Sequence, residues 1–250
     1  MKVGMKLILC LAGGLVLLSG GAWMWRAKTN ATQQQTVAGT QLSKNERIVL
    51  EKYRDKLDRV KADGTNKIVI FTTAIPSPIR SLQEIINEDS LLRVRVIDKE
   101  IVVNEESLSL STWYKLAVIE VLQQQAKIED NFLPQEIPDR LLPVRNSEAI
   151  VVLTGGAITV DGVRIVHTFG NGFFALSKNQ EYLLFAHLES GGKFIRPIAD
   201  SAGAYRIEKN TLVPLEKRPD HTLVQEMREK YNNDLDSFRA DMRLRLLRKN

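Results

Sequence analysis

Apolar and polar residues alternate along the middle of this chain, from about residue 90 to residue 215. A repeat of two is the period of a β-strand with one buried face. The first such strand contains Leu92, Val94 and Val96, and residues 101–103 either continue it or pair with it. Residues 108–122 make a second, longer strand. Later segments of the same character are 150–153, 157–160, 163–166, 182–188, 194–198, 204–207 and 212–215.

Short turn signals separate these segments. Asp161-Gly162 is a two-residue hairpin signal, and Gly191-Gly192 and Lys209-Asn210 mark two further turns. In contrast, three prolines within residues 123–148 exclude a regular helix or a central strand, so this stretch is predicted to be a long loop. Five to seven short strands joined in this way predict a mainly β fold, either a small closed barrel or a sandwich.

The stretch from residue 179 to residue 207 is apolar and aromatic and is interrupted by glycine. Its bulky side chains are expected to fill the interior of the barrel, and they are Leu184, Phe185, Phe194 and Tyr205. Gly203 stands where a barrel strand would bend. We therefore interpret this stretch as the wall of a barrel rather than as the floor of a ligand site.

Two segments with the period of a helix flank the strands. Residues 43–64 start with the capping box Ser43 to Glu46, and their apolar face contains Val49, Tyr53, Leu57 and Val60. Residues 219–250 contain a second amphipathic helix, predicted over 220–247, whose apolar stripe is Val224, Met227, Tyr231, Leu235, Phe238, Met242 and Leu246. We expect this helix to do one of three things: dock on the barrel, pair with the 43–62 helix, or self-associate as a coiled coil.

Two short elements precede the barrel strands. Residues 68–71 predict a strand, which Pro76 and Pro78 end. A second capping box, Ser81 to Glu84, predicts a short helix that ends near Asp89. With the strands that follow, residues 65–218 form the predicted β-barrel domain.

Residues 1–26 have the character of a membrane-directed segment. Residues 7–25 carry no charge, and a helix of 19 residues would reach ~28 Å, close to the ~30 Å hydrocarbon thickness of a bilayer. A retained signal-anchor is favoured over a cleaved signal peptide, because the apolar run continues into Trp23 and Trp25. Residues 27–42 are polar and nearly uncharged, which predicts a linker. These features favour a single-pass protein of the bacterial inner membrane, with its bulk in the periplasm; cleavage and secretion are the alternative.

Charge and cysteine content narrow the choice of partners. The formal net charge is +5, but acids and bases are mixed except at the C-terminus, where Arg243, Arg245, Arg248 and Lys249 outnumber Asp241. This distribution disfavours nucleic acid as a partner. The basic tip either contacts a membrane surface or only places favourable charge at a helix C-terminus, and the sequence leaves both interpretations open. The single cysteine, Cys10, excludes an intrachain disulfide and a cysteine-based zinc site.

Candidate catalytic groups are few and isolated. The three histidines are His167, His187 and His221, and each is interpreted as a surface or hydrogen-bonded structural residue. Asp200 and Ser201 near His187 could be assembled into a triad only by supposition, because Ser201 lacks a nucleophile elbow. The sequence therefore predicts no catalytic, cofactor-binding or metal-binding residue and no enzymatic activity.

Residues from about 80 to 218 resemble a group of uncharacterised exported bacterial proteins with a small OB/netrin-like β-barrel. The matching segments are Ala117–Leu122, Gly156–Gly162, Glu181–Phe185 and Gly203–Ile207. The group has a glycine before its Glu-Tyr pair, where this chain has Asn179 and Gln180. The resemblance implies a barrel and an exported location. It implies no activity, since this chain lacks the N-terminal cysteine of inhibitory netrin-like modules.

Together these observations predict a membrane-tethered or exported envelope protein that acts as a non-catalytic interaction module. Its expected contacts are the membrane, through residues 7–25, and an envelope protein or a second copy, through helix 220–247. The alternative is an OB-type binder of single-stranded nucleic acid or glycan, for which Trp113, Tyr114 and Lys115 form the one suggestive cluster. A hydrolase is the least favoured function.

Overall fold

The computed structural model describes residues 42–72, 81–107, 109–124, 136–169, 174–188, 193–198 and 200–249. The predicted membrane segment 1–26, its apolar run 7–25, Cys10 and nearly all of the linker lie outside the described residues. Among the described helices, none combines the length and the apolar composition that a bilayer crossing would require.

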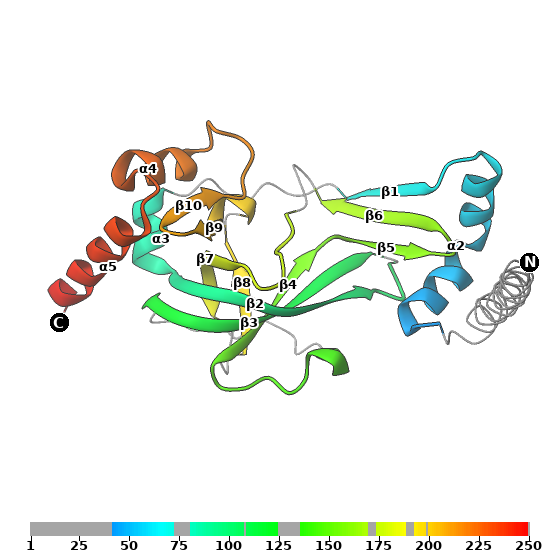
Figure 1. Cartoon of the computed structure of the whole chain (residues 1–250), viewed down its shortest axis with the longest axis horizontal. Coiled ribbons are helices and arrows are strands. Elements are labelled where there is room, and N and C mark those ends of the chain that lie inside the picture. Colours follow the sequence, from blue (N-terminus) through cyan, green and yellow to red (C-terminus); the bar gives the residue numbers. More distant parts are fainter. Residues whose placement is uncertain are drawn as a thin grey trace, which may run out of the picture. The chain divides into compact units, whose positions relative to one another are not determined.

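Five strands close into a barrel, which is compatible with an OB-like barrel (Figure 1). They are β2 (Ser90–Val103), β3 (Leu110–Gln123), β4 (Glu148–Thr154), β7 (Glu181–Leu188) and β8 (Phe194–Pro197). Their order around the barrel is β2-β3-β4-β8-β7, and the pairing of β7 with β2 closes the ring. Only the β4–β8 pair is parallel within this ring. Two more strands, β9 (Ala204–Glu208) and β10 (Thr211–Pro214), extend the sheet outward from β7.

The interior of the barrel is apolar. The alternation predicted for the first strand is confirmed, since Leu92, Val94 and Val96 all contribute to it. Two tyrosines, Tyr114 and Tyr182, also lie inside and are fully buried. Each hydroxyl accepts a hydrogen bond from a backbone N–H, Tyr114 from Leu176 at 3.2 Å and Tyr182 from Ser177 at 2.8 Å. Burial raises the pKa of Tyr114 to about 12, so it remains a neutral core residue.

A separate three-stranded sheet contains β1 (Lys67–Thr72), β6 (Val163–Phe169) and β5 (Gly156–Val160), in the order β1-β6-β5. The predicted hairpin at Asp161-Gly162 is confirmed, with φ of 50° and 76° at its two central residues. Its two strands leave the barrel, however, and pair through β6 with β1, which runs parallel to it. The prediction that these strands belong to the barrel was therefore wrong, because local alternation does not specify the partner of a strand.

The chain leaves the barrel at Gly155 and Gly156. Their φ values of 105° and 158° are uncommon for residues with a side chain. A Cβ atom at Gly156 would lie only 2.9 Å from the Thr112 Oγ1 atom of β3. Glycine is thus required here for the close approach of β5 to the barrel, and it redirects the chain from β4 into the second sheet.

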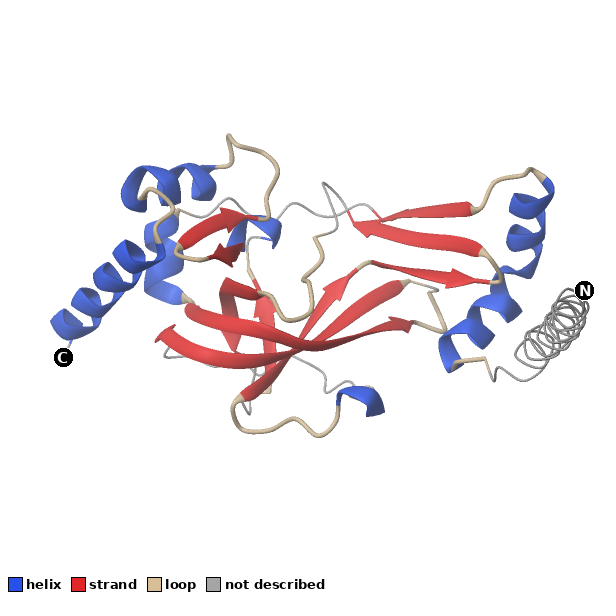
Figure 2. Ribbon diagram, viewed as in Figure 1, coloured by secondary structure: helices blue, strands red, loops and turns tan. Residues whose placement is uncertain are grey.

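Helix α2 (Lys44–Ala62) covers one face of this second sheet (Figure 2). The predicted stripe is confirmed, since Val49, Tyr53 and Leu57 are buried. They pack on side chains from the three strands and on the far ends of β2 and β3, including Val103 and Leu110. The helix ends where Gly64 takes a φ of 68°.

Three helices cover the outer side of β7, β9 and β10: α3 (Leu82–Glu88), α4 (Thr222–Tyr231) and α5 (Leu235–Lys249). The capping box of α3 is confirmed, with Ser81 as N-cap. The predicted continuous helix 220–247 is wrong, because Asn232 and Asn233 adopt left-handed φ values of 51° and 56° between α4 and α5. Their stretch is fixed to the sheet, as the Leu212 N–H donates to the Asn233 carbonyl at 2.7 Å.

The apolar stripe of the C-terminal segment is buried against its own domain up to Met242.

Contrary to the prediction from the sequence, the bulky residues of the 179–207 stretch do not all lie inside the barrel. Leu184 lies inside the barrel, but Phe185 and Tyr205 face outward into the core under the helices. Phe194 packs edge-to-face on Trp113, with ring centroids 6.4 Å apart. The stretch is a wall with apolar packing on both sides.

Candidate binding surfaces

His167 is a structural residue of β6. Its Nδ1 accepts a hydrogen bond from the backbone N–H of Leu110 at 2.9 Å, and its Nε2 lies 2.6 Å from Thr72 Oγ1. The acceptor role of Nδ1 places the proton of the neutral ring on Nε2, which donates to the threonine. With 1 % of its surface exposed, the ring links β6 to the barrel strand β3 and to the neighbouring strand β1 rather than facing a substrate.

The other two histidines lie elsewhere. The Nδ1 atom of His187 is 3.2 Å from Oδ1 of Asp89, whose side chain is fully buried at the C-cap of α3. His221 is the N-cap residue of α4 and its side chain makes no capping hydrogen bond. Each histidine thus has a different environment, and the structure does not bring the three together.

Ser201 lies in η2 (Asp200–Gly203) and is paired with an acid rather than with a histidine. Its hydroxyl donates to Glu216 Oε2 at 2.7 Å, and the Arg218 guanidinium donates to the same carboxylate at 3.1 Å. No base is thereby provided to take the serine proton, because a carboxylate with two strong donors is a poor proton acceptor. The supposed triad of Asp200, Ser201 and His187 gains no support from these contacts.

This carboxylate gives the domain a pH-dependent contribution to stability. Burial acts to raise the pKa of Glu216, but the hydrogen bonds from Arg218 and Ser201 outweigh it and lower the pKa to about 2. Because the pKa is lower in the folded than in the unfolded chain, the contribution is complete above about pH 4.5 and is lost as the pH falls toward 2. In Glu216→Gln, we expect the fall of the urea midpoint from pH 7 to pH 3 to become smaller than in the wild type.

The control for this measurement is the exposed Glu208, since Glu208→Gln is expected to leave that fall unchanged. Circular dichroism at both pH values measures all three midpoints. An identical pH dependence in Glu216→Gln and the wild type would contradict the assigned role of Glu216.

The cluster expected for an OB-type binder is covered by the chain itself. Trp113 is 3 % exposed and packs against Leu141, a fully buried residue of η1 (Asp139–Leu141) in the long loop. Tyr114 points into the barrel. The ammonium of Lys115 lies 3.1 Å from Glu148 Oε2 and donates to the Pro143 carbonyl at 2.6 Å. None of the three residues offers an exposed ring or a free cation for stacking or binding a nucleic acid.

An apolar surface remains exposed on the second sheet. We define the β1 face as Val69, Phe71, Ala157 and Val166, which lie on the side away from α2. Val69 is opposite Val166, and Val166 is opposite Ala157, so the three form a row across the sheet. Phe71 is 78 % exposed and Val69 40 %. Among the described residues, no strand pairs with the outer edge of β1.

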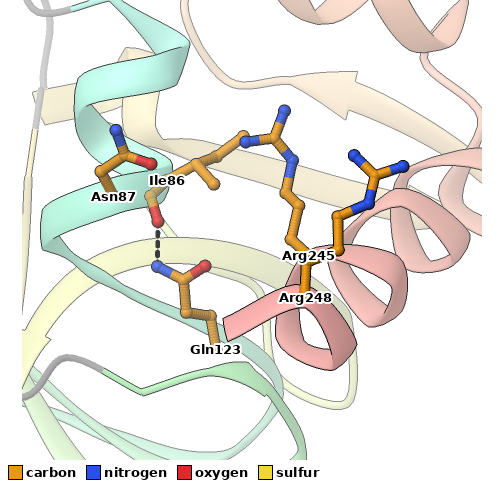
Figure 3. A pocket seen from close by; sticks show the side chains of 5 residues that line it. All are labelled: Ile86, Asn87, Gln123, Arg245 and Arg248. Carbon is orange, nitrogen blue, oxygen red and sulfur yellow. Dashed lines mark hydrogen bonds between the residues drawn. The ribbon is translucent and has the colours of Figure 1, made fainter. Parts of the chain in front are cut away.

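A second surface feature is a small pocket between α3 and α5, which we call the α3–α5 pocket (Figure 3). Its volume is about 190 Å³ and its lining residues are Ile86, Asn87, Gln123, Arg245 and Arg248. The Gln123 amide donates to the carbonyls of Ile86 and Asp89, which fixes the end of β3 to α3. Arg245 donates to Asp241 and to Gln83, both at 3.1 Å, so its guanidinium is held at the pocket.

The sequence indicates the basic C-terminal tip, but neither the β1 face nor the α3–α5 pocket. Residues 68–71 predict a short strand, and their four consecutive apolar residues give it two apolar faces, of which α2 covers one. The basic tip of the C-terminal helix was recognised, but its neighbours Asn87 and Gln123 are more than a hundred residues away in the sequence. Comparison with models of protein families found no match, and a search of curated proteins found no significantly similar sequence.

Proposed function

We propose that this chain is a membrane-tethered or exported protein of the bacterial envelope that acts as a non-catalytic interaction module. In this proposal, the β1 face binds an extended segment of a protein partner. The exposed Phe71 beside the open edge of β1 carries the proposal. Residues 7–25 supply the membrane attachment and residues 27–42 the spacer.

The β1 face has the two properties that strand addition needs. An open edge offers backbone N–H and C=O groups for hydrogen bonds with an added strand. The side chains of Val69 and Phe71 point to the same face and would receive apolar side chains of that strand. Soluble proteins commonly cover or charge such edges to avoid aggregation, and Lys67 is the sole charged residue of β1.

The surface also suits a protein partner better than a small ligand. An exposed aromatic side chain is typical of the few residues that carry most of the binding energy in protein interfaces. The charged residues Lys67 and Arg164 lie opposite each other beside the apolar row and would form part of a polar rim. An acidic or neutral partner strand with alternating apolar residues fits this arrangement.

Photocrosslinking from the β1 face tests the proposal. Benzoylphenylalanine is placed at Phe71 in the full chain, and a matched variant carries it at Ile119, an apolar residue of β3 that is 41 % exposed. In cells that express the chain at its native level, we expect position 71, and not position 119, to give one defined crosslinked protein. A crosslink to a second copy would assign the face to self-association, and equal crosslinking from both positions would contradict a specific surface.

The membrane attachment is tested separately. Carbonate washing of the membrane fraction is expected to leave the full chain bound and to release a variant that begins at residue 27. Release of the full chain would contradict a retained anchor.

A further inference from the structure

We propose that the C-terminal end of α5 is a second membrane contact that binds the phosphate group of anionic phospholipids in the α3–α5 pocket. The proposal rests on the membrane attachment in the proposed function and adds the surface that meets the bilayer and the lipid class that it recognises. Three features of the last two turns of α5 support it: exposed leucines, a surplus of arginine and the composition of the pocket.

The first feature is apolar surface on the side of α5 that faces away from the core. Phe238 and Met242 are buried against the domain, whereas Leu244 is 53 % exposed and Leu247 is 75 % exposed. Leu244 and Leu247 are three residues apart and so are neighbours on one helix face. Neighbouring exposed aliphatic side chains beside basic residues are a feature of helices that lie at a membrane interface.

The second feature is the local excess of positive charge. Asp241 is the last acid of the sequence, and it is occupied by Tyr231, Lys230 and Arg245. Beyond it, the guanidinium of Arg243 is largely exposed and lies 3.8 Å from Glu120, and Arg248 is exposed. Cations at a helix C-terminus also interact favourably with the helix dipole. That effect explains the arginines but not the leucines between them, whereas an interfacial helix needs both.

The third feature is the pocket itself. Arg245 and Arg248 line it from α5, and Asn87 lines it from α3 (Figure 3). None of its five lining residues is acidic. The Asn87 carbonyl oxygen accepts from Gln83 at 2.9 Å, which leaves the Asn87 amide N–H₂ as a donor. The Arg248 guanidinium and the Asn87 amide are the kinds of donor that bind a phosphate, and Arg does so with paired hydrogen bonds. Arg245, which also donates to Asp241 and Gln83, adds positive charge beside them.

The size of the pocket and the position of the leucines favour a head group at a bilayer over other anions. A volume of about 190 Å³ is below the range of pockets for drug-sized ligands, roughly 300–1,000 Å³, and suits a single small anionic group. A free phosphate would gain nothing from Leu244 and Leu247. A phospholipid, in contrast, presents its phosphate at the depth where leucines next to arginines enter the interface.

The experiment uses the full chain reconstituted in vesicles. The variant Cys10→Ala with Leu247→Cys carries an environment-sensitive NBD label at position 247, and a control carries it at Glu106, an exposed turn residue between β2 and β3. We expect the label at position 247 to shift to shorter wavelength in vesicles of phosphatidylcholine with phosphatidylglycerol, and not in phosphatidylcholine alone. The label at position 106 should not respond to lipid charge. A response at both positions would overturn the proposal.

The arginines are tested in the same assay. Arg248→Gln alone, and with Arg245→Gln, is compared with Arg54→Gln on the exposed side of α2. From about 1 kcal/mol per basic residue near an anionic surface, the double variant should lower the ratio of buried to exposed label on the order of 30-fold. Arg54→Gln should leave the ratio unchanged. Since Arg245 also pairs with Asp241, the single Arg248→Gln variant keeps the test valid if the double variant folds poorly.

Other outcomes separate this inference from the proposed function and from a free anion. If the chain stays in the vesicles but position 247 gives the same emission with both lipids, the inference fails and the membrane attachment stands. If the chain is released from the vesicles by carbonate, the attachment itself fails. Inorganic phosphate is also titrated into the labelled chain. If it changes the emission of the label at position 247 and phosphatidylglycerol does not, the pocket binds a free anion and the lipid assignment is wrong.

Discussion

Replacement of Phe238 by alanine is expected to lower the free energy of unfolding by about 3–5 kcal/mol, the range for deletion of a buried aromatic ring. The side chain is fully buried where α5 meets the barrel wall. Its ring centroid lies 6.2 Å from that of Phe185 and 5.0 Å from that of Tyr231, both in edge-to-face geometry. The truncation therefore leaves a cavity and removes two aromatic contacts. Urea denaturation of the full chain in mild detergent, followed by circular dichroism, measures the change.

A matched control is available in Phe71→Ala, which removes the same side chain from an exposed position. Its effect on the free energy of unfolding should remain within about 0.5 kcal/mol. A similar loss for both variants would show that the aromatic cluster of Phe185, Tyr231 and Phe238 does not hold α5 to the barrel. The pair thus separates core packing from surface binding, since Phe71→Ala should impair partner binding without unfolding the domain.

Replacement of His167 by alanine is expected to cost about 2–4 kcal/mol. The ring is buried, and its loss leaves the backbone N–H of Leu110 without its acceptor in a place that water does not reach. An unsatisfied buried donor costs about 1–3 kcal/mol, and the vacated volume adds to this. Urea denaturation as for Phe238→Ala measures the loss.

Thr72→Val is the companion variant for His167. It removes the hydroxyl partner of Nε2 and retains the bond from Leu110 to Nδ1. Its cost should be about 1 kcal/mol, the net worth of one hydrogen bond. If Thr72→Val lowered the free energy of unfolding as much as His167→Ala, the hydrogen bond from the Leu110 N–H to His167 Nδ1 would contribute little to stability.

The sequence predicted which segments form strands and helices better than it predicted which strands pair with each other. Leu92, Val94 and Val96 faced the expected side because a period of two fixes which side chains share a face. The pairing of β1 with β6 could not be predicted, because it joins segments about 97 residues apart and neither segment carries a sequence signal for its partner. The turn at Asp161-Gly162 likewise identified a hairpin but not the sheet to which it belongs.

One other difference has a local cause that the sequence did contain, and a second does not. Asn232-Asn233 interrupts the C-terminal helix, and asparagine is one of the few residues that tolerate the left-handed conformation found there. The periodicity continued across the break because α4 and α5 bury their apolar residues in the same core. The sequence places Leu141 in a polar loop, and its burial against Trp113 is not predictable because the loop is long and irregular.

The candidate surfaces were harder to predict than the fold. The arginines of the C-terminal tip were visible in the sequence, but Asn87 and Gln123 reach the same pocket only because α3 and the end of β3 meet there. Exposure of Phe71 depends on which side of β1 is covered by α2, and a strand with apolar residues on both faces does not reveal this.

The strands β2 and β3 are each 14 residues long and contribute side chains to the barrel interior and to the core beneath α2. One part of this ribbon lines the barrel interior with residues such as Val94 and Tyr114, and its far end places Val103 and Leu110 beneath α2. Because a continuous pair of strands links the two cores, melting either one would loosen the hydrogen-bonded ladder on which the other depends. We therefore expect the barrel and the smaller sheet to unfold as one cooperative unit rather than as two independent modules.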